Sequence, residues 1–425
     1  MTNNTLCGRF NFLTSPVFIL LALSIAYMIL SFTPFRLGND VLRYIQIKEW
    51  LEAGKHPVSE MGNRLPYGYP VLLLLLSKLG LCSSFYIVLV NYLYLGGSLY
   101  FVNSIFRSSI KAWQLIVLTL LNWTIVKSTI TPLSDIQYLF FSTGALFFYT
   151  AYMDNKKTGN LAGLLIFTFL AIITRTIGVL LVFSMVLTLI LQKKNTSRRK
   201  AQTLRILLFT TILFLIIIVV FSTFFRINDY INLMLSFFEA DPAGFWITNL
   251  RWHLADLAEV FINTSQFKIN FIGVGIKEIF FIATGVFSLI YFFFLLIKKK
   301  KDIPMVIIIY LLGYIIIVFN WPTYDARFWV PLVPLLIAVV LHTPVHMKPY
   351  LRYGFLSWKF VYVFLGTFVI GYYSYLIFNR SEFAKKHDAG IWKNEYETYF
   401  LEKPFDNRNT KTRPYILHVL YTYDR

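Results

Sequence analysis

The chain is poor in charge and in the short motifs that mark many soluble enzymes. Only 14% of its 425 residues are charged, whereas a soluble domain averages about 25%. A glycine-rich phosphate loop and a Ser-His-Asp arrangement are both missing from the sequence, so neither of those site types is indicated. Short strands of alternating polarity are also missing, which excludes a transmembrane β-barrel.

Long apolar runs are present instead. Hydrophobic residues make up 57% of the chain and aromatic residues 18%, and the mean hydropathy is +0.61. Apolar runs of about 18–20 residues recur, and each is long enough to cross a hydrocarbon core of roughly 30 Å. The sequence therefore predicts an all-α polytopic membrane protein.

The formal net charge of +19 raises the question of a nucleic-acid partner. Lys and Arg lie in groups at the ends of apolar runs, which is the pattern of the positive-inside rule for membrane proteins. We therefore expect no nucleic acid as a partner. We expect a multi-pass protein of a cell membrane, with the bacterial inner membrane favoured.

Six basic groups orient the chain. They are Arg9, Arg107 with Lys111, Lys156–Lys157, Lys193–Lys200, Lys298–Lys301, and Lys348 with Arg352. If all six face the cytoplasm, the spans between them come in pairs, with the N-terminus inside and the C-terminus outside. The sequence then predicts about eleven transmembrane helices, at 16–33, 84–106, 112–130, 136–153, 160–174, 177–192, 204–225, 270–297, 303–320, 328–344 and 357–378. Cys7 and Cys82 fall on opposite sides, so no disulfide is expected.

This topology gives a transmembrane domain, 1–378, followed by an outer tail, 379–425. The inner connectors are short and basic, whereas the outer ones are irregular, aromatic and charged. The outer connectors are the loop 34–83, the turns Thr129–Asp135, Thr174–Gly178 and Asn320–Arg327, and the long loop 226–269. So many irregular segments on one face favour a functional site there; the alternative is that they are ordinary solvated loops.

The loop 34–83 shows helical order. Between Asp40 and Ala53, apolar residues recur at approximately helical spacing, and Gly54 is a typical helix stop. We predict a short helix lying on the membrane surface. Asp40 stands at its start, where a carboxylate can serve simply as a cap. The segment Arg64–Gly80 has an apolar stretch too short to span, and predicts a second interfacial or re-entrant helix.

Four motifs in this order resemble the GT-C superfamily of polytopic glycosyltransferases, especially the dolichyl-phosphate-mannose-type and aminoarabinose-transferase-like members. The first runs from Asp40 through Tyr44 and "WLEAG" to "YGYP" at Tyr67–Pro70. The others are "TPLSDIQYLFF", which contains Asp135, "ITRTIGVLLV" and "YDARFWVPLVPLLI". The resemblance covers roughly residues 1–345 and implies a GT-C-like fold. It implies transfer of a sugar from a polyprenyl-phosphate donor to a glycan, lipid or protein acceptor at the outer face, with inversion.

The residue types fit that chemistry. An acceptor hydroxyl needs a carboxylate within hydrogen-bond reach, and Asp40 is the candidate base, with Asp135 as a second catalytic carboxylate. The leaving phosphate needs cations, and arginine binds phosphate oxygens with two parallel donors. The candidate phosphate ligands are Arg327, Arg175 and Arg64. The candidate substrate-binding residues are Tyr44, Tyr67, Tyr69, Tyr324 and Asp325. Two structural interpretations remain open. Arg175 can simply extend from a helix end toward the membrane surface, and Arg327 can pair with Asp325 or Asp135.

The chain departs from the resemblance in one respect. Some GT-C members have two adjacent carboxylates in the first loop, whereas this chain has Asn39–Asp40. Asp40 and Asp135 can still share a divalent cation, Mg²⁺ or Mn²⁺, because Mg²⁺ needs only one or two carboxylates plus phosphate. No tight structural metal is expected. His342 and His346 are interpreted as interface histidines, because Pro344 interrupts their helix and no acidic residue is near them in the sequence.

Two other classes of protein share several of these features. A transporter or flippase of a lipid-linked glycan has a polytopic fold and basic inner loops, but it often shows internal repeats and mid-membrane polar residues, which this sequence lacks. A polysaccharide polymerase or ligase with a lipid-diphosphate donor also works at the outer face with arginines, and it does not need a first-loop Asp.

Overall fold

The computed structural model describes residues 16–54, 65–107, 109–191, 227–269, 273–299, 302–342, 349–404 and 413–424. Every regular element in these ranges is a helix. Three helical segments there are long and apolar enough to cross a membrane: Ser84–Ile105, Val274–Lys299 and Arg352–Phe378. Six shorter apolar helices accompany them. The predicted all-α class and the membrane character are confirmed in this coarse form.

The described part of the chain contains α-helices and short 3₁₀ helices. The α-helices before the long outer loop are α2 (Pro16–Ser31), α3 (Asn39–Glu52), α4 (Gly68–Lys78), α5 (Ser84–Ile105), α6 (Ala112–Leu120), α7 (Trp123–Thr129), α8 (Asp135–Asn155), α9 (Thr158–Thr174) and α10 (Val179–Leu191). The later α-helices are α12 (Ile227–Ala240), α13 (Pro242–Ile262), α14 (Val274–Lys299), α15 (Met305–Phe319), α16 (Val333–Leu341), α17 (Pro349–Phe378), α18 (Arg380–Lys386), α19 (Lys393–Leu401) and α20 (Arg413–Tyr423). Short 3₁₀ helices are η2 (Thr176–Gly178), η3 (Gln266–Lys268), η4 (Ala326–Leu332) and η5 (His387–Gly390).

Most predicted spans coincide with a helix, but two predictions were wrong in form. The segment 112–130 is not one helix, because it breaks after Leu120 and restarts at Trp123. Asn122 causes the restart: its side-chain oxygen accepts from the amides of Thr124 and Ile125 and caps α7. The predicted span 328–344 similarly begins as the 3₁₀ helix η4 and continues as α16. The predicted span 204–225 lies outside the described residues.

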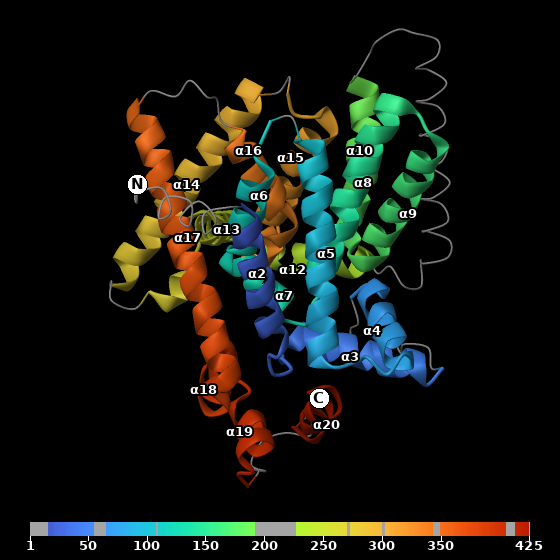
Figure 1. The fold of residues 1–425 in the computed structure, drawn as a ribbon, viewed down its shortest axis with the longest axis vertical. Helices are drawn as coiled ribbons and strands as arrows, with labels where there is room; N and C mark the ends of the chain where they lie inside the picture. The colour runs from blue at the N-terminus through green and yellow to red at the C-terminus, as the bar shows by residue number, and fades with distance from the viewer. Residues whose placement is uncertain are drawn as a thin grey trace, which may run out of the picture.

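The two short helices predicted in the first outer loop are present as α3 and α4. α3 ends where Gly54 adopts a left-handed conformation with φ +63°, which glycine tolerates at no steric cost. In Figure 1, α3 lies across one end of α5, and α4 lies close by at the same end. A side chain at Gly68, the first residue of α4, would collide with the backbone of Ile173 at 2.7 Å. The absence of a side chain there lets α4 pack against the end of α9.

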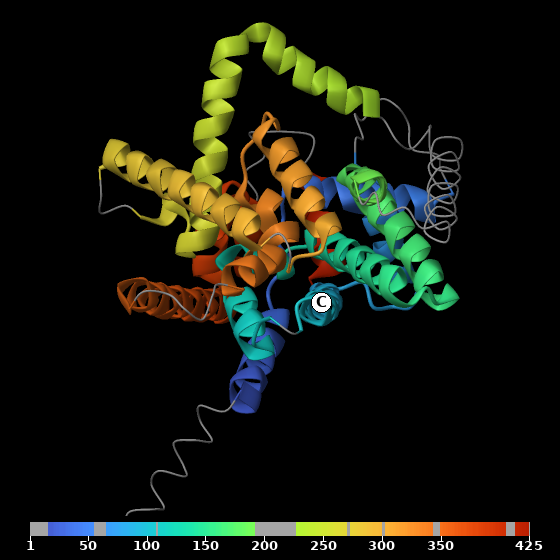
Figure 2. The same ribbon diagram turned by 90° about the horizontal axis from the view of Figure 1, so that it is seen from above.

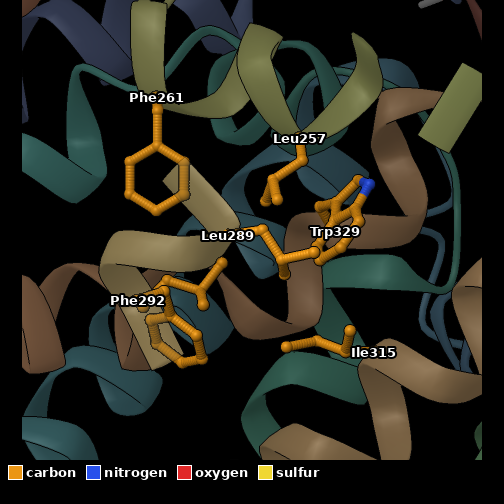
Figure 3. Close-up of a pocket in the computed structure, with 7 residues that line it drawn as sticks. Leu257, Phe261, Leu289, Phe292, Ile315 and Trp329 are labelled. Atoms are coloured by element: carbon orange, nitrogen blue, oxygen red, sulfur yellow. The ribbon is translucent and has the colours of Figure 1, made fainter. Parts of the chain in front are cut away.

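Aromatic packing holds the central helices in place. Phe101 of α5, Phe140 of α8 and Phe167 of α9 form a group with ring centroids 5.4–5.5 Å apart. This packing fixes α8, whose first residue is Asp135. On the other side of the core Trp329 is fully buried, and Figure 3 shows it with Leu257, Leu289 and Ile315 around an apolar gap. Trp329 thereby anchors η4 two residues after Arg327.

The segment that contains α12 and α13 and the C-terminal tail lie in different parts of the fold. Figure 2 shows α12 and the start of α13 projecting from the helical body, while the end of α13 packs against it. α13 makes extensive contact with α14 and η4. After α17, the helices α18, α19 and α20 fold back toward α3, below it in Figure 1. The tail is therefore part of the fold at the end of the molecule that carries the first outer loop.

Candidate functional site

Asp40 and Arg327 form an ion pair between α3 and η4. The Arg327 Nη2 donates to the Asp40 Oδ2 at 2.5 Å, and the side chains are 23% and 21% exposed, respectively. Asp325 helps to hold the guanidinium, with its Oδ2 3.4 Å from Nε and its Oδ1 accepting from the Arg327 amide at 3.0 Å. The other Asp40 oxygen, Oδ1, lies 3.6 Å from Nη1 of the exposed Arg43. Arg327 therefore holds one oxygen of Asp40, and the other oxygen makes a longer contact with Arg43.

A second ion pair lies beside the first. Arg175, at the end of α9, donates to Asp135, at the start of α8, and the Asp135 side chain is only 3% exposed. Tyr44 connects the two pairs, because its hydroxyl is 2.8 Å from the Ser134 hydroxyl and its helix carries Asp40. Tyr69 packs edge-on against Tyr44, with ring centroids 5.1 Å apart. Residues from five separate parts of the sequence thus meet at one place.

Burial and opposite charges act against each other at these groups. Burial disfavours the charged form of Arg175, but the Asp135 carboxylate together with Tyr314 and Tyr44 more than offsets it, so the Arg175 pKa is raised above its ordinary value. Asp40, followed by Asp135 and Asp325, does the same for Arg327, whose pKa is also raised against its burial. Burial raises the pKa of Asp325, but Lys127 and Arg327 more than offset it, so that pKa is lowered. We call Asp40, Asp135, Asp325, Arg175, Arg327 and Lys127 the charge cluster.

The remaining predicted residues lie around this cluster or outside the described chain. Tyr324 stacks on Trp252 of α13, with ring centroids 4.2 Å apart and an interplanar angle of 8°. Tyr67 is the half-buried residue immediately before α4. Arg64 lies outside the described residues. The structure therefore joins Asp40, Asp135, Asp325, Arg175, Arg327, Tyr44 and Tyr69, and it places Tyr324 against the long outer loop.

The geometry does not support the interpretation of Asp40 as a helix cap. The N-cap residue of α3 is Gly38, and it makes no side-chain cap hydrogen bond. Asp40 is the second residue of the helix, where its charge still favours the helix dipole. Its carboxylate is directed to Arg327 instead. The open question about Arg327 is also resolved: it pairs with Asp40 and Asp325, and Asp135 pairs with Arg175.

The carboxylates do not offer a good metal site in this arrangement. Among the described residues, no group of three or more His, Cys, Asp or Glu side chains could hold a metal ion. Asp40 and Asp135 each accept from a guanidinium, so a cation between them would have to displace an arginine. His342 does have an acidic neighbour, Asp302 at 3.3 Å, which the sequence did not suggest. His346 lies outside the described residues.

A stripe of buried polar residues on α13 was missed by the sequence analysis. His253, Asp256 and Glu259 are each 1–2% exposed and follow one another at helical spacing. His253 Nε2 lies 2.9 Å from the Trp321 carbonyl oxygen, and Nδ1 lies 3.5 Å from Asp256 Oδ2. Burial raises the pKa of Glu259 to about 8. The sequence signal for this stripe was the recurrence of polar residues at every third position in a segment that is rich in aromatic residues.

The tail contacts the peptide that leads to Asp40. Tyr396 accepts from the Leu37 amide at 2.8 Å and donates to the Phe35 carbonyl at 2.8 Å. His387 Nε2 lies 2.9 Å from the Leu37 carbonyl, and Asp424 accepts from the Phe35 amide at 2.5 Å. We call these contacts the tail interface. Because they fix both sides of the Phe35–Leu37 backbone, they set where α3 begins.

The helix α3 is also held from the tail along its length. Tyr415 donates to Glu49 at 3.1 Å, and Lys48 donates to Tyr423 at 3.3 Å. The tail interface therefore positions the whole of α3, including its first turn.

Comparison with known proteins adds no assignment: no family model matches the chain, and no curated protein and no solved structure matches it.

Proposed function

We propose that the chain is a membrane glycosyltransferase that moves a sugar from a polyprenyl-phosphate donor to an acceptor hydroxyl at the outer face of a cell membrane. The ion pair between Asp40 and Arg327 carries this proposal. It joins the candidate base to the candidate phosphate ligand although they come from distant parts of the chain. In this proposal about eleven helices span the membrane, with the charge cluster on the outer side.

The proposed step is an inverting displacement. The acceptor oxygen forms a bond to the anomeric carbon, and the bond from that carbon to the phosphate oxygen breaks. The electron pair leaves with the polyprenyl phosphate, and the acceptor proton goes to Asp40 Oδ1, the oxygen that Arg327 does not hold. Holding the donor and the acceptor together in one complex lowers the barrier to transfer through proximity, in addition to the effect of the base.

The other residues have supporting roles in the proposal. Arg327 uses Nη2 to hold Asp40, and its Nη1 side is assigned to the leaving phosphate, whose developing charge it would stabilise. Arg175 is assigned mainly to Asp135, whose carboxylate it keeps paired. Tyr44, Tyr69 and the stacked Tyr324 are assigned to the sugar or its acceptor. The proposed step requires no metal ion.

Replacement of Asp40 by Asn tests the proposal. Asn has nearly the same shape but cannot take the proton, so we expect Asp40→Asn to insert and bind donor normally and to lose transfer by ~10²–10⁴-fold. The assay uses purified protein in detergent, radiolabelled polyprenyl-phosphate sugars and a membrane extract that supplies the acceptor. Asp154→Asn, at an exposed position of α8, is the matched control.

Two results would contradict this assignment. Full activity of Asp40→Asn would remove Asp40 from the mechanism. A wild-type protein that transfers no sugar from any such donor, but moves a lipid-linked glycan across reconstituted vesicles, would identify a transporter instead. A polymerase or ligase would be recognised by transfer from lipid-diphosphate donors only.

A further inference from the structure

Arg36 is a buried cation with no carboxylate among its contacts in the described residues. Its residue is only 4% exposed, and its Nη2 is buried with no hydrogen-bond partner in the described part of the chain. The Arg36 Nε donates to the Thr33 hydroxyl at 3.1 Å. Burial lowers the pKa of Arg36 from its ordinary value, and the opposing effects come from tyrosines. A buried guanidinium in this state is costly and is usually either paired or functional.

Lys268 brings a second positive charge to the same place. Its Nζ lies 4.4 Å from the ring centre of Tyr372 and 5.2 Å from that of Tyr373. The Arg36 guanidinium carbon lies 4.9 Å from the ring centre of the same Tyr373. Lys268 itself is solvent-exposed. Two cations from the first outer loop and from η3 are thus gathered around one ring of α17.

The balance of charges around Arg36 and Lys268 differs from that of the charge cluster. The cluster contains three carboxylates and three cations, so an added anion there competes with Asp40, Asp135 or Asp325. Neither Arg36 nor Lys268 has a carboxylate among its contacts in the described residues; aromatic rings hold both of them. Cation–π contacts recover only part of the cost of desolvating a charge. An anion is the missing component.

The surroundings indicate an anion that is carried by a lipid. Tyr372 and Tyr373 lie in the last two turns of α17, which ends at Phe378, and tyrosines are enriched at the level of lipid headgroups. Nearby Tyr375 and Phe378 are 48% and 75% exposed, as expected for side chains that face lipid. A phosphate group is the anion found at that depth, and arginine with lysine is a suitable pair of ligands for it.

We propose that Arg36 and Lys268 form a binding site for the phosphate group of a membrane lipid. The phosphate accepts from Arg36 Nη2 and from Lys268 Nζ, while Tyr372 and Tyr373 flank it. The lipid is either a polyprenyl phosphate or an anionic phospholipid, since both present the same oxygens. The site does not depend on sugar transfer, and it adds a second cationic site to the one that contains Arg327.

A structural role for Arg36 makes a different prediction. Arg36 also lies 5.1 Å from the ring centre of Phe383 in α18, so it contributes to the attachment of the tail. If that is its sole role, removal of its charge lowers stability without a specific effect on phosphate, and removal of Lys268 has no effect on binding. Lys268 separates the two roles because its exposed side chain is not needed to fill the core.

The test measures lipid binding by native mass spectrometry of the full chain in a maltoside detergent, which contains no phosphate. The probes are undecaprenyl phosphate, undecaprenol and phosphatidylglycerol. We expect the wild type to prefer a phosphate-bearing probe to undecaprenol, and Arg36→Gln and Lys268→Gln each to weaken that binding by about tenfold. Lys385→Gln, an exposed lysine paired with Glu382, is the control and should bind as wild type does.

The probes also identify the lipid, and each outcome decides the proposal. If the two variants lose binding of undecaprenyl phosphate alone, or of phosphatidylglycerol alone, the result supports the site and identifies its ligand. Equal binding of undecaprenol and undecaprenyl phosphate, or wild-type binding by Lys268→Gln, overturns it. If Arg36→Gln does not fold, Lys268→Gln decides. Asp40→Asn should bind both phosphates normally, so failure of the proposed sugar transfer leaves this result unaffected.

Discussion

Asp40 and Arg327 are separated by 287 residues in the chain, yet their side chains are in direct contact at 2.5 Å. The contact joins the first turn of an outer-loop helix to a 3₁₀ helix anchored by the buried Trp329. Both charges therefore lie on helical segments. Charges placed on defined elements in this way are preorganised, which favours a reaction with charge separation.

Replacement of Arg327 tests whether activity requires the planar arrangement of its guanidinium donors or only its positive charge. Arg327→Lys keeps a positive charge but loses the planar arrangement of donors, so we expect a loss of transition-state stabilisation on the order of 1.5–3 kcal/mol. Arg327→Ala should lose more. Steady-state kinetics and donor affinity are the measurements, and Arg43→Lys, whose side chain is 51% exposed beside the same Asp40, is the control. Wild-type values for both Arg327 variants would leave it as a structural ion-pair partner.

The tail interface makes a prediction about turnover. Tyr396→Phe removes one hydroxyl and leaves the Leu37 amide and the Phe35 carbonyl without that partner. An unsatisfied buried group costs about 1–3 kcal/mol, so thermal stability should fall. Because α3 is then less well positioned, kcat should fall with a smaller change in KM. Tyr421→Phe, at a residue that is 56% exposed, should change neither; an unchanged kcat in Tyr396→Phe would separate the tail from catalysis.

His387 gives the tail interface a pH dependence. Burial, together with the charge of Arg36, lowers the pKa of His387 from 6.5 to about 3. The folded protein therefore holds His387 neutral, and its Nε2–H donates to the Leu37 carbonyl. Between pH 6.5 and 3 the unfolded chain binds the extra proton, so the contribution of His387 to stability is full above pH 6.5 and is lost as the pH falls toward 3.

A comparison of melting temperatures across that pH range tests this prediction. The wild type should lose stability as the pH falls, and His387→Asn, which has no proton to take up, should lose less over the same interval. His418→Asn alters an exposed histidine of α20 and should follow the wild type. Parallel curves for all three proteins would show that His387 does not titrate with folding.

The proposed topology is tested by labelling. A single cysteine at position 385, introduced after Cys7 and Cys82 are replaced, lies at an exposed site in α18. A membrane-impermeant maleimide should label it in intact spheroplasts, and a cysteine at position 156 should be protected until the membrane is opened. Protection of position 385 would show that the tail is inside and would reject the eleven-span arrangement.

Local features of the fold were predictable from the sequence. The apolar stripe from Asp40 to Ala53 and the Gly54 stop predicted α3, and the short apolar stretch after Pro70 predicted α4. Both depend on neighbours within a few residues, which periodicity reports directly. The break in the segment 112–130 was not predictable in this way. Its polar ends are satisfied by Asn263, which accepts from the Trp123 amide at 2.6 Å from 140 residues away.

The members of the charge cluster other than Lys127 were named from the sequence, but the Asp40–Arg327 and Asp135–Arg175 pairs were not predicted. Asp40, Asp135, Asp325, Arg175 and Arg327 were named because they lie in outer turns with recognisable motifs. Which carboxylate meets which arginine depends on how α8, α9 and η4 pack, and no local pattern encodes that. Arg36 was overlooked for a similar reason. Its importance comes from burial against Tyr373 and Phe383, which lie more than 300 residues further along the chain.

The contact between Phe35 and Asp424 also has a consequence for biosynthesis, because it spans 389 residues. At a synthesis rate of about 5–20 residues per second, the first outer loop is made roughly 20–80 s before its partner in the tail. During that interval the backbone of Phe35–Leu37 lacks the tail contacts, and α3 has no fixed start. Most of the helical body is thus synthesised well before the tail interface can form. A newly made chain gains the contacts that fix Phe35–Leu37 only when its last helices dock.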